Sequence, residues 1–252
     1  PALQVSGEFL PFDQMGVLKG TLQVADLKAQ CRKYGVSITK YLAAALLWSV
    51  IRTETDGKNL KKPAALNLPV NLRSFFDSET LANFFAVVNI SWPKGRAPEN
   101  FREVLTNVSR QMDEQIVKER LEETISYNVS NEKKWYVRAI PLFIKHLAME
   151  LIFLRTSRAH TMTFSNIGPA KIREDLREDV EDFELLIGAS PKQRMKCGAV
   201  AYDGKLCLAF TSAMAENRLP EVFFRFLEDQ GIPVEQESNG ITDLEHDKGR
   251  YP

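Results

Sequence analysis

Residues 205–231 read Lys-Leu-Cys-Leu-Ala-Phe-Thr-Ser-Ala-Met-Ala-Glu-Asn-Arg-Leu-Pro-Glu-Val-Phe-Phe-Arg-Phe-Leu-Glu-Asp-Gln-Gly. This stretch predicts an apolar strand, a short polar corner and an amphipathic helix that begins near Pro220 and ends at Gly231. Residues 195–202 form a second strand-like run just upstream, and the dipeptide Asp203-Gly204 between the two suits a two-residue type I′ turn. The chain is therefore predicted to close with a β-hairpin, a corner and a helix.

The rest of the chain alternates between helical and strand-like patterns. Helical spacing of apolar residues predicts helices over 24–34, from an N-cap at Thr39 to residue 51, over 98–123, and over 135–153 with a break at Pro141. β-Forming runs predict strands over 64–72, 84–92, 161–166 and 183–189. This order indicates an α/β two-layer sandwich with a mixed, mainly antiparallel sheet and helices packed on one side.

Composition excludes several classes of protein. With 252 residues, 44% of them hydrophobic, the chain can bury the core of one large domain or two small ones. The 33 basic and 33 acidic residues balance, so we expect no attraction to nucleic acid or to an anionic membrane. The longest apolar stretch, residues 41–51, is shorter than the roughly 20 residues that span a bilayer, and no signal peptide is visible.

Three cysteines, Cys31, Cys197 and Cys207, have spacings that suit no metal motif. Cys197 and Cys207 fall in strand-like segments, where inert buried thiols are common. An odd number of such thiols favours a reducing compartment, so we expect a cytoplasmic protein.

Three further segments, taken with the corner, carry a family resemblance. They are Asn67-Leu68-Pro69-Val70-Asn71-Leu72-Arg73 with the following Leu81-Ala82-Asn83-Phe84-Phe85, then Phe164-Ser165-Asn166-Ile167-Gly168-Pro169, and upstream Val36-Ser37-Ile38-Thr39-Lys40-Tyr41-Leu42-Ala43-Ala44-Ala45-Leu46. Over about residues 20–231 they resemble, in order, the second half of alcohol acetyltransferase-like and condensation-domain-like enzymes. These enzymes belong to the chloramphenicol acetyltransferase-like, or coenzyme A-dependent acyltransferase, superfamily. The family often has Gly where this chain has Ala82.

The resemblance implies a C-terminal acyltransferase-like domain over residues 21–234. The residues themselves predict an irregular lead-in with an extended stretch over 1–20 and a polar mobile tail over 235–252. Complete enzymes of the family have two similarly folded halves, and the first half carries H-H-x-x-x-D. Its second His takes a proton from the acceptor, which then attacks an acyl thioester. The corresponding corner here holds Thr211, Ser212, Ala213, Met214, Ala215, Glu216 and Asn217, so we expect the chain alone to be inactive.

The leading function implied is the non-catalytic half of an acyltransferase. Such a half forms one wall of an interdomain tunnel, through which coenzyme A or a carrier thioester donates its acyl group to a hydroxyl or amine. The implied partner is a His-bearing N-terminal half in the same polypeptide, and the implied co-substrate is a coenzyme A thioester, with no covalently bound cofactor. Two alternatives stay open: a stand-alone binding or assembly protein, possible as a homo-oligomer, and a piece of a peptide-synthetase condensation domain.

The resemblance places four residues near the tunnel. Arg73 is a candidate for binding a phosphate or for a structural ion pair. Asn83 and Asn166 are candidates for binding a ligand carbonyl or for tying down loop backbone. Ser165 is a candidate donor to a developing oxyanion.

Other polar residues offer weaker candidates. Ser212 and Glu216 lack a group that titrates near neutral pH unless burial raises the pKa of the carboxyl. His146 fits a packed or half-exposed position on a helix. His160 precedes a strand without an Asp four residues later, and His246 lies in the tail. The acid-rich run over 173–182 suits a solvated loop or a docking surface between halves.

Overall fold

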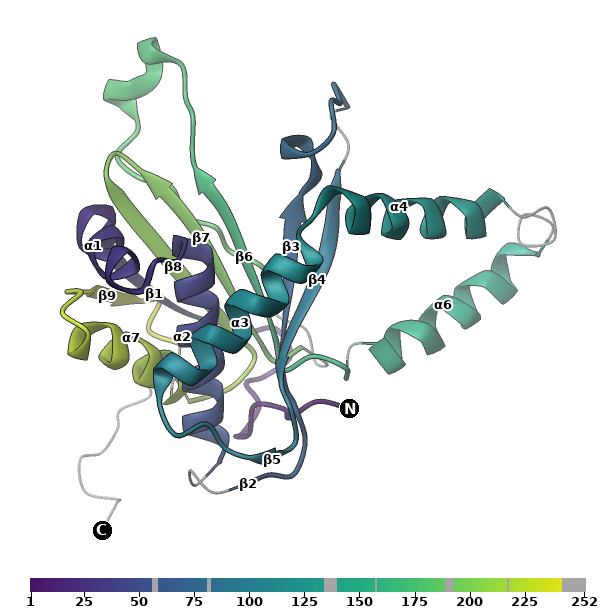
Figure 1. Cartoon of the computed structure of the whole chain (residues 1–252), viewed down its shortest axis with the longest axis horizontal. Coiled ribbons are helices and arrows are strands. Elements are labelled where there is room, and N and C mark those ends of the chain that lie inside the picture. Colours follow the sequence, from purple (N-terminus) through teal and green to yellow (C-terminus); the bar gives the residue numbers. More distant parts are fainter. Residues whose placement is uncertain are drawn as a thin grey trace.

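The structure is a computed structural model and describes residues 1–55, 59–80, 83–133, 140–156, 158–188, 193–216 and 218–241. A seven-stranded sheet runs in the order β4-β3-β6-β7-β8-β1-β9 (Figure 1). Its strands are β1 (Gly16–Gln23), β3 (Ala64–Asn71), β4 (Phe85–Trp92), β6 (Met162–Pro169), β7 (Met195–Tyr202), β8 (Lys205–Ser212) and β9 (Glu235–Ser238). The β3–β6 and β6–β7 pairs are parallel and the other neighbours are antiparallel. The predicted mixed, mainly antiparallel sheet is confirmed.

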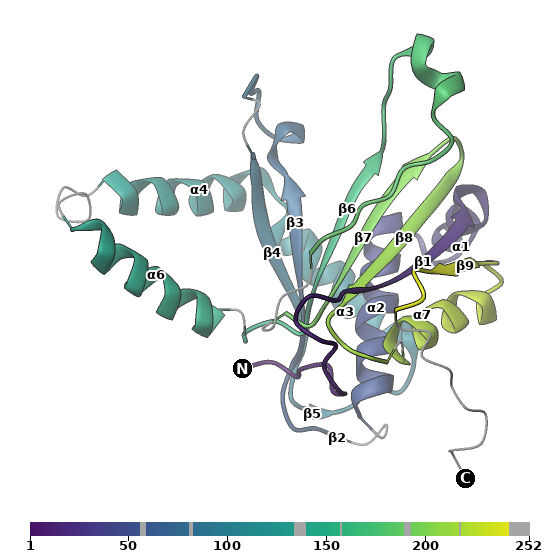
Figure 2. The same cartoon turned by 180° about the vertical axis from the view of Figure 1, so that it is seen from behind.

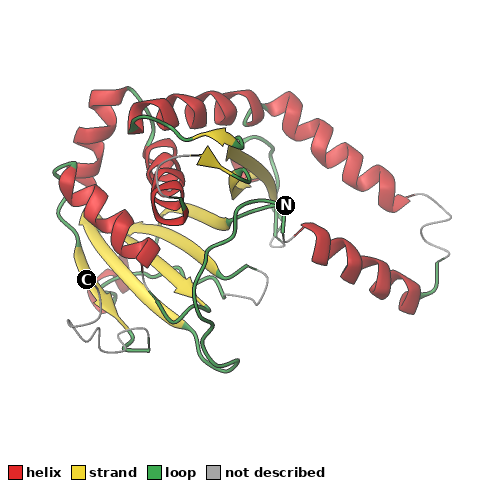
Figure 3. Cartoon of the chain, turned by 90° about the horizontal axis from the view of Figure 1, so that it is seen from below, coloured by secondary structure: helices red, strands yellow, loops and turns green. Residues whose placement is uncertain are grey.

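Helices cover one face of this sheet (Figures 1 and 2). They are α1 (Val24–Tyr34), α2 (Ile38–Glu54), α3 (Phe101–Gln115) and α7 (Arg218–Asp229). Two more helices, α4 (Lys118–Lys133) and α6 (Leu142–Thr156), form an arm that projects away from the sheet (Figure 3). Short elements complete the fold: the pair β2 (Asn59–Leu60) and β5 (Gly95–Arg96), and the 3₁₀ turns η1 (Leu72–Ser74) and η2 (Glu174–Asp179). The predicted α/β sandwich is confirmed.

Helix α2 is the centre of the core. Its residues Tyr41, Leu42, Leu46 and Leu47 are fully buried, because α2 lies between the sheet and the helices α3 and α7. The N-cap is Ser37, whose hydroxyl accepts a hydrogen bond from the backbone N–H of Lys40 at 3.3 Å. The predicted cap at Thr39 was therefore wrong, because the helix begins one residue before Thr39.

Apolar content alone does not make a membrane segment here. Within the described residues, no single helix is long and apolar enough to cross a bilayer. Only α1 and α2 taken together pass that test, and they are bent by 84° at the break between them.

Helix boundaries correct two further predictions. The single helix expected over 98–123 is two helices, because the chain leaves helical geometry at Ile116 (φ −93°, ψ 57°) between α3 and α4. Helix α6 begins at Leu142, directly after Pro141, and extends to Thr156. The first residues of the helix expected from 135 lie outside the described residues.

The strand predicted over 183–189 is wrong for the part that is described, 183–188. This segment is extended but crosses the open face of the sheet instead of joining it. It passes so close to β7 that a Cβ on Gly198 would lie 2.0 Å from the carbonyl oxygen of Leu185. Lys196 Nζ holds it by donating to the Gly188 carbonyl at 2.7 Å, and Lys19 forms an ion pair with Glu184. The alternation in its sequence therefore reflects burial against a sheet face.

Both ends of the chain enter the sheet further than expected. The lead-in expected over 1–20 is irregular only up to Met15, because β1 begins at Gly16. The polar tail expected over 235–252 was wrong for Glu235–Ser238, which pair with β1 as β9. Residues 242–252 lie outside the described part of the chain.

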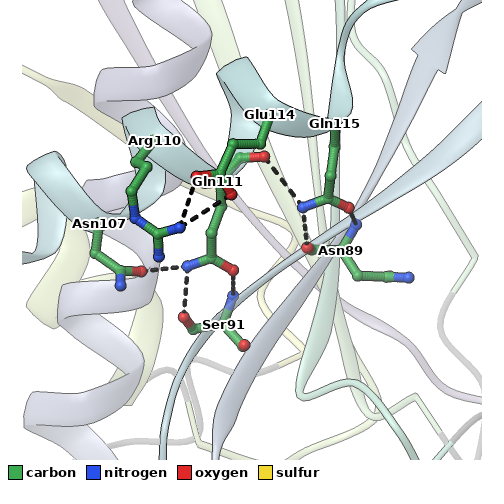
Figure 4. A network of polar contacts seen from close by, with 7 residues as sticks. All are labelled: Asn89, Ser91, Asn107, Arg110, Gln111, Glu114 and Gln115. Atoms are coloured by element: carbon green, nitrogen blue, oxygen red, sulfur yellow. Dashed lines mark hydrogen bonds and ion pairs between the residues drawn. The ribbon is translucent and has the colours of Figure 1, made fainter. Parts of the chain in front are cut away.

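Strand β4 forms one edge of the sheet, and two glutamines of α3 cap it (Figure 4). The Gln111 amide accepts from the Ser91 N–H at 3.0 Å and donates to the Ser91 carbonyl at 2.8 Å. The Gln115 amide does the same for the backbone of Asn89, at 3.3 and 2.9 Å. The two side chains thus take the place of the next strand and satisfy an edge that would otherwise invite pairing with another chain.

Replacing both Gln111 and Gln115 by alanine is expected to promote association of the protein through β4. The substitutions leave two N–H and two C=O groups of an edge strand without their partners. Sedimentation velocity over a concentration series should show more dimer and larger species than the parent chain. The control is Arg110→Ala with Glu114→Ala, which removes an exposed ion pair from the same helix. Equal sedimentation of the glutamine variant and the parent would contradict the role given to these side chains.

Candidate functional site

A pocket of about 340 Å³ opens between β3 and β6 at the N-terminus of α2. Leu68, Val70 and Asn71 of β3 line one side, and Phe164 and Asn166 of β6 line the other. The N-terminus of α2 and the C-terminal end of α3 complete the lining, with the residues Ser37, Thr39, Lys40, Met112, Asp113 and Ile116. All three sequence segments that carry the family resemblance therefore meet in this pocket.

The pocket exists because β3 and β6 separate. Their parallel pairing extends only over Leu66 with Met162 and Asn67 with Thr163. In β3, the backbone N–H and C=O groups of every second residue face β6. The Thr161 N–H, for example, donates to the Ala65 carbonyl. After Ala65 and Asn67, the next β3 residue whose N–H would pair with β6 is therefore residue 69. Residue 69 is proline and has no N–H to donate. The two strands diverge beyond this point, as Figure 1 shows.

Asn166 is the predicted site residue that the structure places in the pocket. Its Nδ2 donates to Thr39 Oγ1 at 3.1 Å, which joins β6 to the first turn of α2. Its Oδ1 accepts from the N–H of Gly168 at 2.9 Å, and Gly168 has a φ of +75°. The amide is thus oriented by two hydrogen bonds and is half-buried at the pocket wall.

The end of the pocket at the α2 N-terminus carries an ion pair and a helix dipole. Lys40 lines it and forms an ion pair with Asp113 at 2.5 Å between Nζ and Oδ1. The N-terminus of α2 adds the partial positive charge of its helix dipole at the same end. The apolar side chains Leu68, Met112 and Phe164 lie elsewhere on the wall. The pocket therefore combines a polar end with an apolar lining.

Lys40, Asp113 and Thr39 were not singled out as site residues from the sequence. Lys40 and Thr39 stand within a segment that carries the resemblance, so that segment was the available signal. The sequence contains no such signal for Asp113. It is separated from Lys40 by 73 residues, and the apolar pattern of its helix indicates only which face is buried.

The other three predicted binding residues lie outside the pocket lining. Arg73 is exposed and donates from Nη2 to the Thr80 carbonyl at 2.8 Å, which ties the loop that follows β3. Asn83 is exposed just before β4, and its neighbours Leu81 and Ala82 lie outside the described residues. Ser165 is half-buried between two pocket-lining residues of β6, so strand alternation directs it to the opposite face of the sheet.

The corner at residues 211–217, where the resemblance places a histidine motif, lies towards the other end of the sheet. Ser212, the last residue of β8, pairs with Met195, whereas Asn166 pairs with Ala199 further along β7. The Thr211 hydroxyl donates to the Ile187 carbonyl, and the Ser212 hydroxyl accepts from the Met214 N–H at 2.9 Å. Glu216 is exposed, and Asn217 lies outside the described residues. Both hydroxyl groups are therefore engaged in hydrogen bonds with backbone groups.

No described histidine lines the pocket. His146 is exposed on α6, and His246 lies outside the described residues. His160 precedes β6 at the end far from Asn166, and burial lowers the pKa of its imidazole. In the part of the chain that the structure describes, no group of three or more His, Cys, Asp or Glu residues could hold a metal ion.

The three cysteines are free. Burial raises the pKa of the Cys31 and Cys207 thiols to about 11, and raises that of Cys197 as well. The thiols are thus protonated near neutral pH, which is unlike the state of a nucleophilic cysteine.

Comparison with known proteins shows the fold alone. No family profile matches this chain, and no curated protein sequence matches it. Among solved structures, a nonribosomal peptide synthetase matches with a TM-score of 0.54, at 13% identity, over 91% of this chain and 23% of that chain. The epimerization domain from the third module of tyrocidine synthetase B matches with a TM-score of 0.52, at 14% identity, over 89% of this chain and 51% of that chain.

The structure titled for condensation domain-mediated chain release from the enacyloxin polyketide synthase also matches, with a TM-score of 0.50, at 12% identity, over 90% of this chain and 42% of that chain. This chain thus spans about half or less of the solved chains that it resembles. The α/β fold expected from the sequence is confirmed: the chain has the fold found in the condensation-type and epimerization domains of these solved structures.

Proposed function

We propose that this chain is one half of an acyltransferase and forms a wall of the thioester tunnel. The enzyme would move an acyl group from a coenzyme A or carrier thioester to a hydroxyl or amine. A second half that bears the H-H-x-x-x-D histidine would supply the base that deprotonates the acceptor. The observation that supports this proposal is the pocket itself, where the three segments of the family resemblance come together at the opening between β3 and β6.

The properties of the pocket suit a thioester donor. Its volume of about 340 Å³ is at the lower end of small-molecule sites. Asn166 and the α2 N-terminus present polar groups to the amides of a pantetheine arm, and Leu68, Met112 and Phe164 present apolar surface to an acyl chain. The role of the chain itself is to bind and orient the donor.

The proposal assigns no chemical step to this chain alone. The hydroxyls of Thr211 and Ser212 are fastened to backbone, and no described histidine lines the pocket. A general base must lie within hydrogen-bond reach of the proton that it removes. Turnover by the isolated chain that depends on Ser212 or Glu216 would overturn this assignment.

Asn166→Ala is expected to weaken donor binding about tenfold, which corresponds to about 1.4 kcal/mol. The substitution removes the amide that joins Thr39 to the turn at Gly168 and exposes the pocket wall. Calorimetric titration of the chain with acetyl-coenzyme A and with an acyl-pantetheine would measure the change. Ser165→Ala on the same strand is the matched control, and its affinity should stay within about twofold of the parent. Equal affinities for parent and Asn166→Ala would count against this pocket as the donor site.

A carrier-bound donor is the second candidate to test. The solved structures that share the fold are named for peptide-synthetase and polyketide-synthase domains. A carrier protein loaded with an acyl-phosphopantetheine should therefore be titrated in parallel with the free thioester. Tighter binding of the loaded carrier would identify a condensation-type enzyme, and tighter binding of acyl-coenzyme A would identify a free-thioester enzyme.

A further inference from the structure

Most of the large exposed apolar side chains of the described residues lie away from the helices that cover the sheet. Apart from Phe9 and Phe12, the large exposed ones of the described residues all lie on β4, on β6, on the crossover before β7, or on the arm and its hinge. None lies on α1, α2, α3 or α7. Large exposed apolar patches on a soluble fold mark interaction sites.

Helix α6 carries the largest group of these side chains among the described elements. Phe143 is 74% exposed, Leu142 68%, Met149 62% and Leu147 60%. The consecutive exposed residues 142–144 and 151–153 point in directions about 100° apart, so the apolar surface extends round the whole helix. A helix that is apolar all round is normally buried, and an isolated helix of this length is marginal in water.

The length and polarity of α6 indicate which kind of partner would cover this apolar surface. With 15 residues α6 is shorter than the roughly 20 that span a bilayer, and it lacks the charged face of a helix that lies flat on a membrane. A two-fold contact between the α6 helices of two copies would cover only one side of each. A groove in a separate folded domain covers several sides at once.

The position of the arm indicates which part of the fold such a domain would cover. The arm leaves the body of the fold directly after Ile116, which lines the pocket between β3 and β6. Glutamines cap the β4 edge, and the opposite edge ends in the four-residue strand β9 with Glu235 and Glu237. A partner is thus directed to the arm and the splayed strands. In two solved chains that share this fold, the match covers 42% and 51% of the length, so about half of each of those chains lies outside the match.

We infer that α6 is the docking element for the His-bearing half, which holds the helix in an apolar groove and closes the pocket between β3 and β6. This inference rests on the proposed function. Exposed polar residues of α6 are few, so its contribution to the interface is mainly the removal of apolar surface from water.

A photo-cross-linking amino acid at position 147 tests the inference in the polypeptide as its native cell makes it. The expected product joins position 147 to a peptide of the domain that carries H-H-x-x-x-D, in the same or another chain. The same label at Thr106, exposed on α3, is the control and should not give that product. A cross-link from position 147 to phospholipid, to α6 of a second copy or to an unrelated protein would overturn the inference, as would no cross-link.

Acyl transfer measured on the same preparation separates the two proposals. The expected cross-link without any transfer would leave docking in place and refute the acyltransferase function. Transfer without the cross-link would refute docking alone.

A pair of substitutions gives an independent reading. Leu147→Glu should lower acyl transfer at least tenfold, and Leu147→Met should change it less than about twofold, with thermal unfolding of this chain unchanged in both. Equal rates for the two variants would contradict the inference.

Discussion

Gly198→Ala should detach the segment 183–188 from the open face of the sheet. The added Cβ would lie 2.0 Å from the Leu185 carbonyl oxygen and 2.8 Å from Leu185 Cγ, and a backbone atom cannot yield as a flexible side chain does. The segment must therefore move, which strains or breaks its bonds to Lys19, Lys196 and Thr211. Overpacking of this kind costs about 1–3 kcal/mol of the free energy of unfolding.

Two measurements check this result. Urea unfolding should give the lower stability, and limited proteolysis should cut within 183–188 faster than in the parent. Gly188→Ala is the control, since nothing lies within 4 Å of a Cβ at that position. If Gly198→Ala and Gly188→Ala unfold at the same urea concentration, the close crossing of β7 is not a feature of the protein in solution.

Leu46→Ala should lower the free energy of unfolding by about 2–5 kcal/mol, a large part of the roughly 5–15 kcal/mol that holds a typical domain together. Leu46 is fully buried in α2, where the sheet and two helices surround it. Alanine is the best helix former, so the loss would report packing and the cavity left behind.

The matched substitution is Leu151→Ala on α6. Leu151 is 60% exposed, so the same truncation should change the stability of this chain by less than about 0.5 kcal/mol. Chemical denaturation of both variants gives the comparison. Similar losses for the two would mean that α6 is packed in solution and that the arm is not an exposed element.

Local signals in the sequence predicted the elements that depend on local chemistry. Asp203 and Gly204 have positive φ values of 43° and 78°, as the predicted two-residue turn requires. Helix α1 ends at Gly35 in the left-handed conformation, as expected from the glycine that follows its apolar pattern.

Features that depend on distant parts of the chain were not predictable in this way. The segment 183–188 has the composition of a strand, but only the small residue at position 198 allows it to cross the sheet there. The break at Ile116 lies inside an apolar spacing that continues on both sides, so the pattern of hydrophobic residues does not reveal it.

In the candidate site too, some residues could be predicted from local sequence and others only from the fold. Asn166 was predicted from a motif at the end of a strand, and it lies in the pocket. The pairing of Lys40 with Asp113 and of Asn166 with Thr39 joins residues far apart in sequence, so it needed the fold. Arg73, Asn83 and Ser165 stand in the same motifs, but loop geometry and strand alternation place them elsewhere.

Pro69, which itself lines the pocket, gives the opening an origin in the backbone, because it has no N–H to donate to β6. The strands part where a backbone donor is missing, so the position of the opening is fixed by one residue and its chemistry by others. Leu68, Met112 and Phe164 can therefore change in size without closing the gap between the strands. If the pocket holds an acyl donor, as proposed above, a scaffold of this kind can diverge towards longer, shorter or more polar acyl groups while the entrance stays where it is.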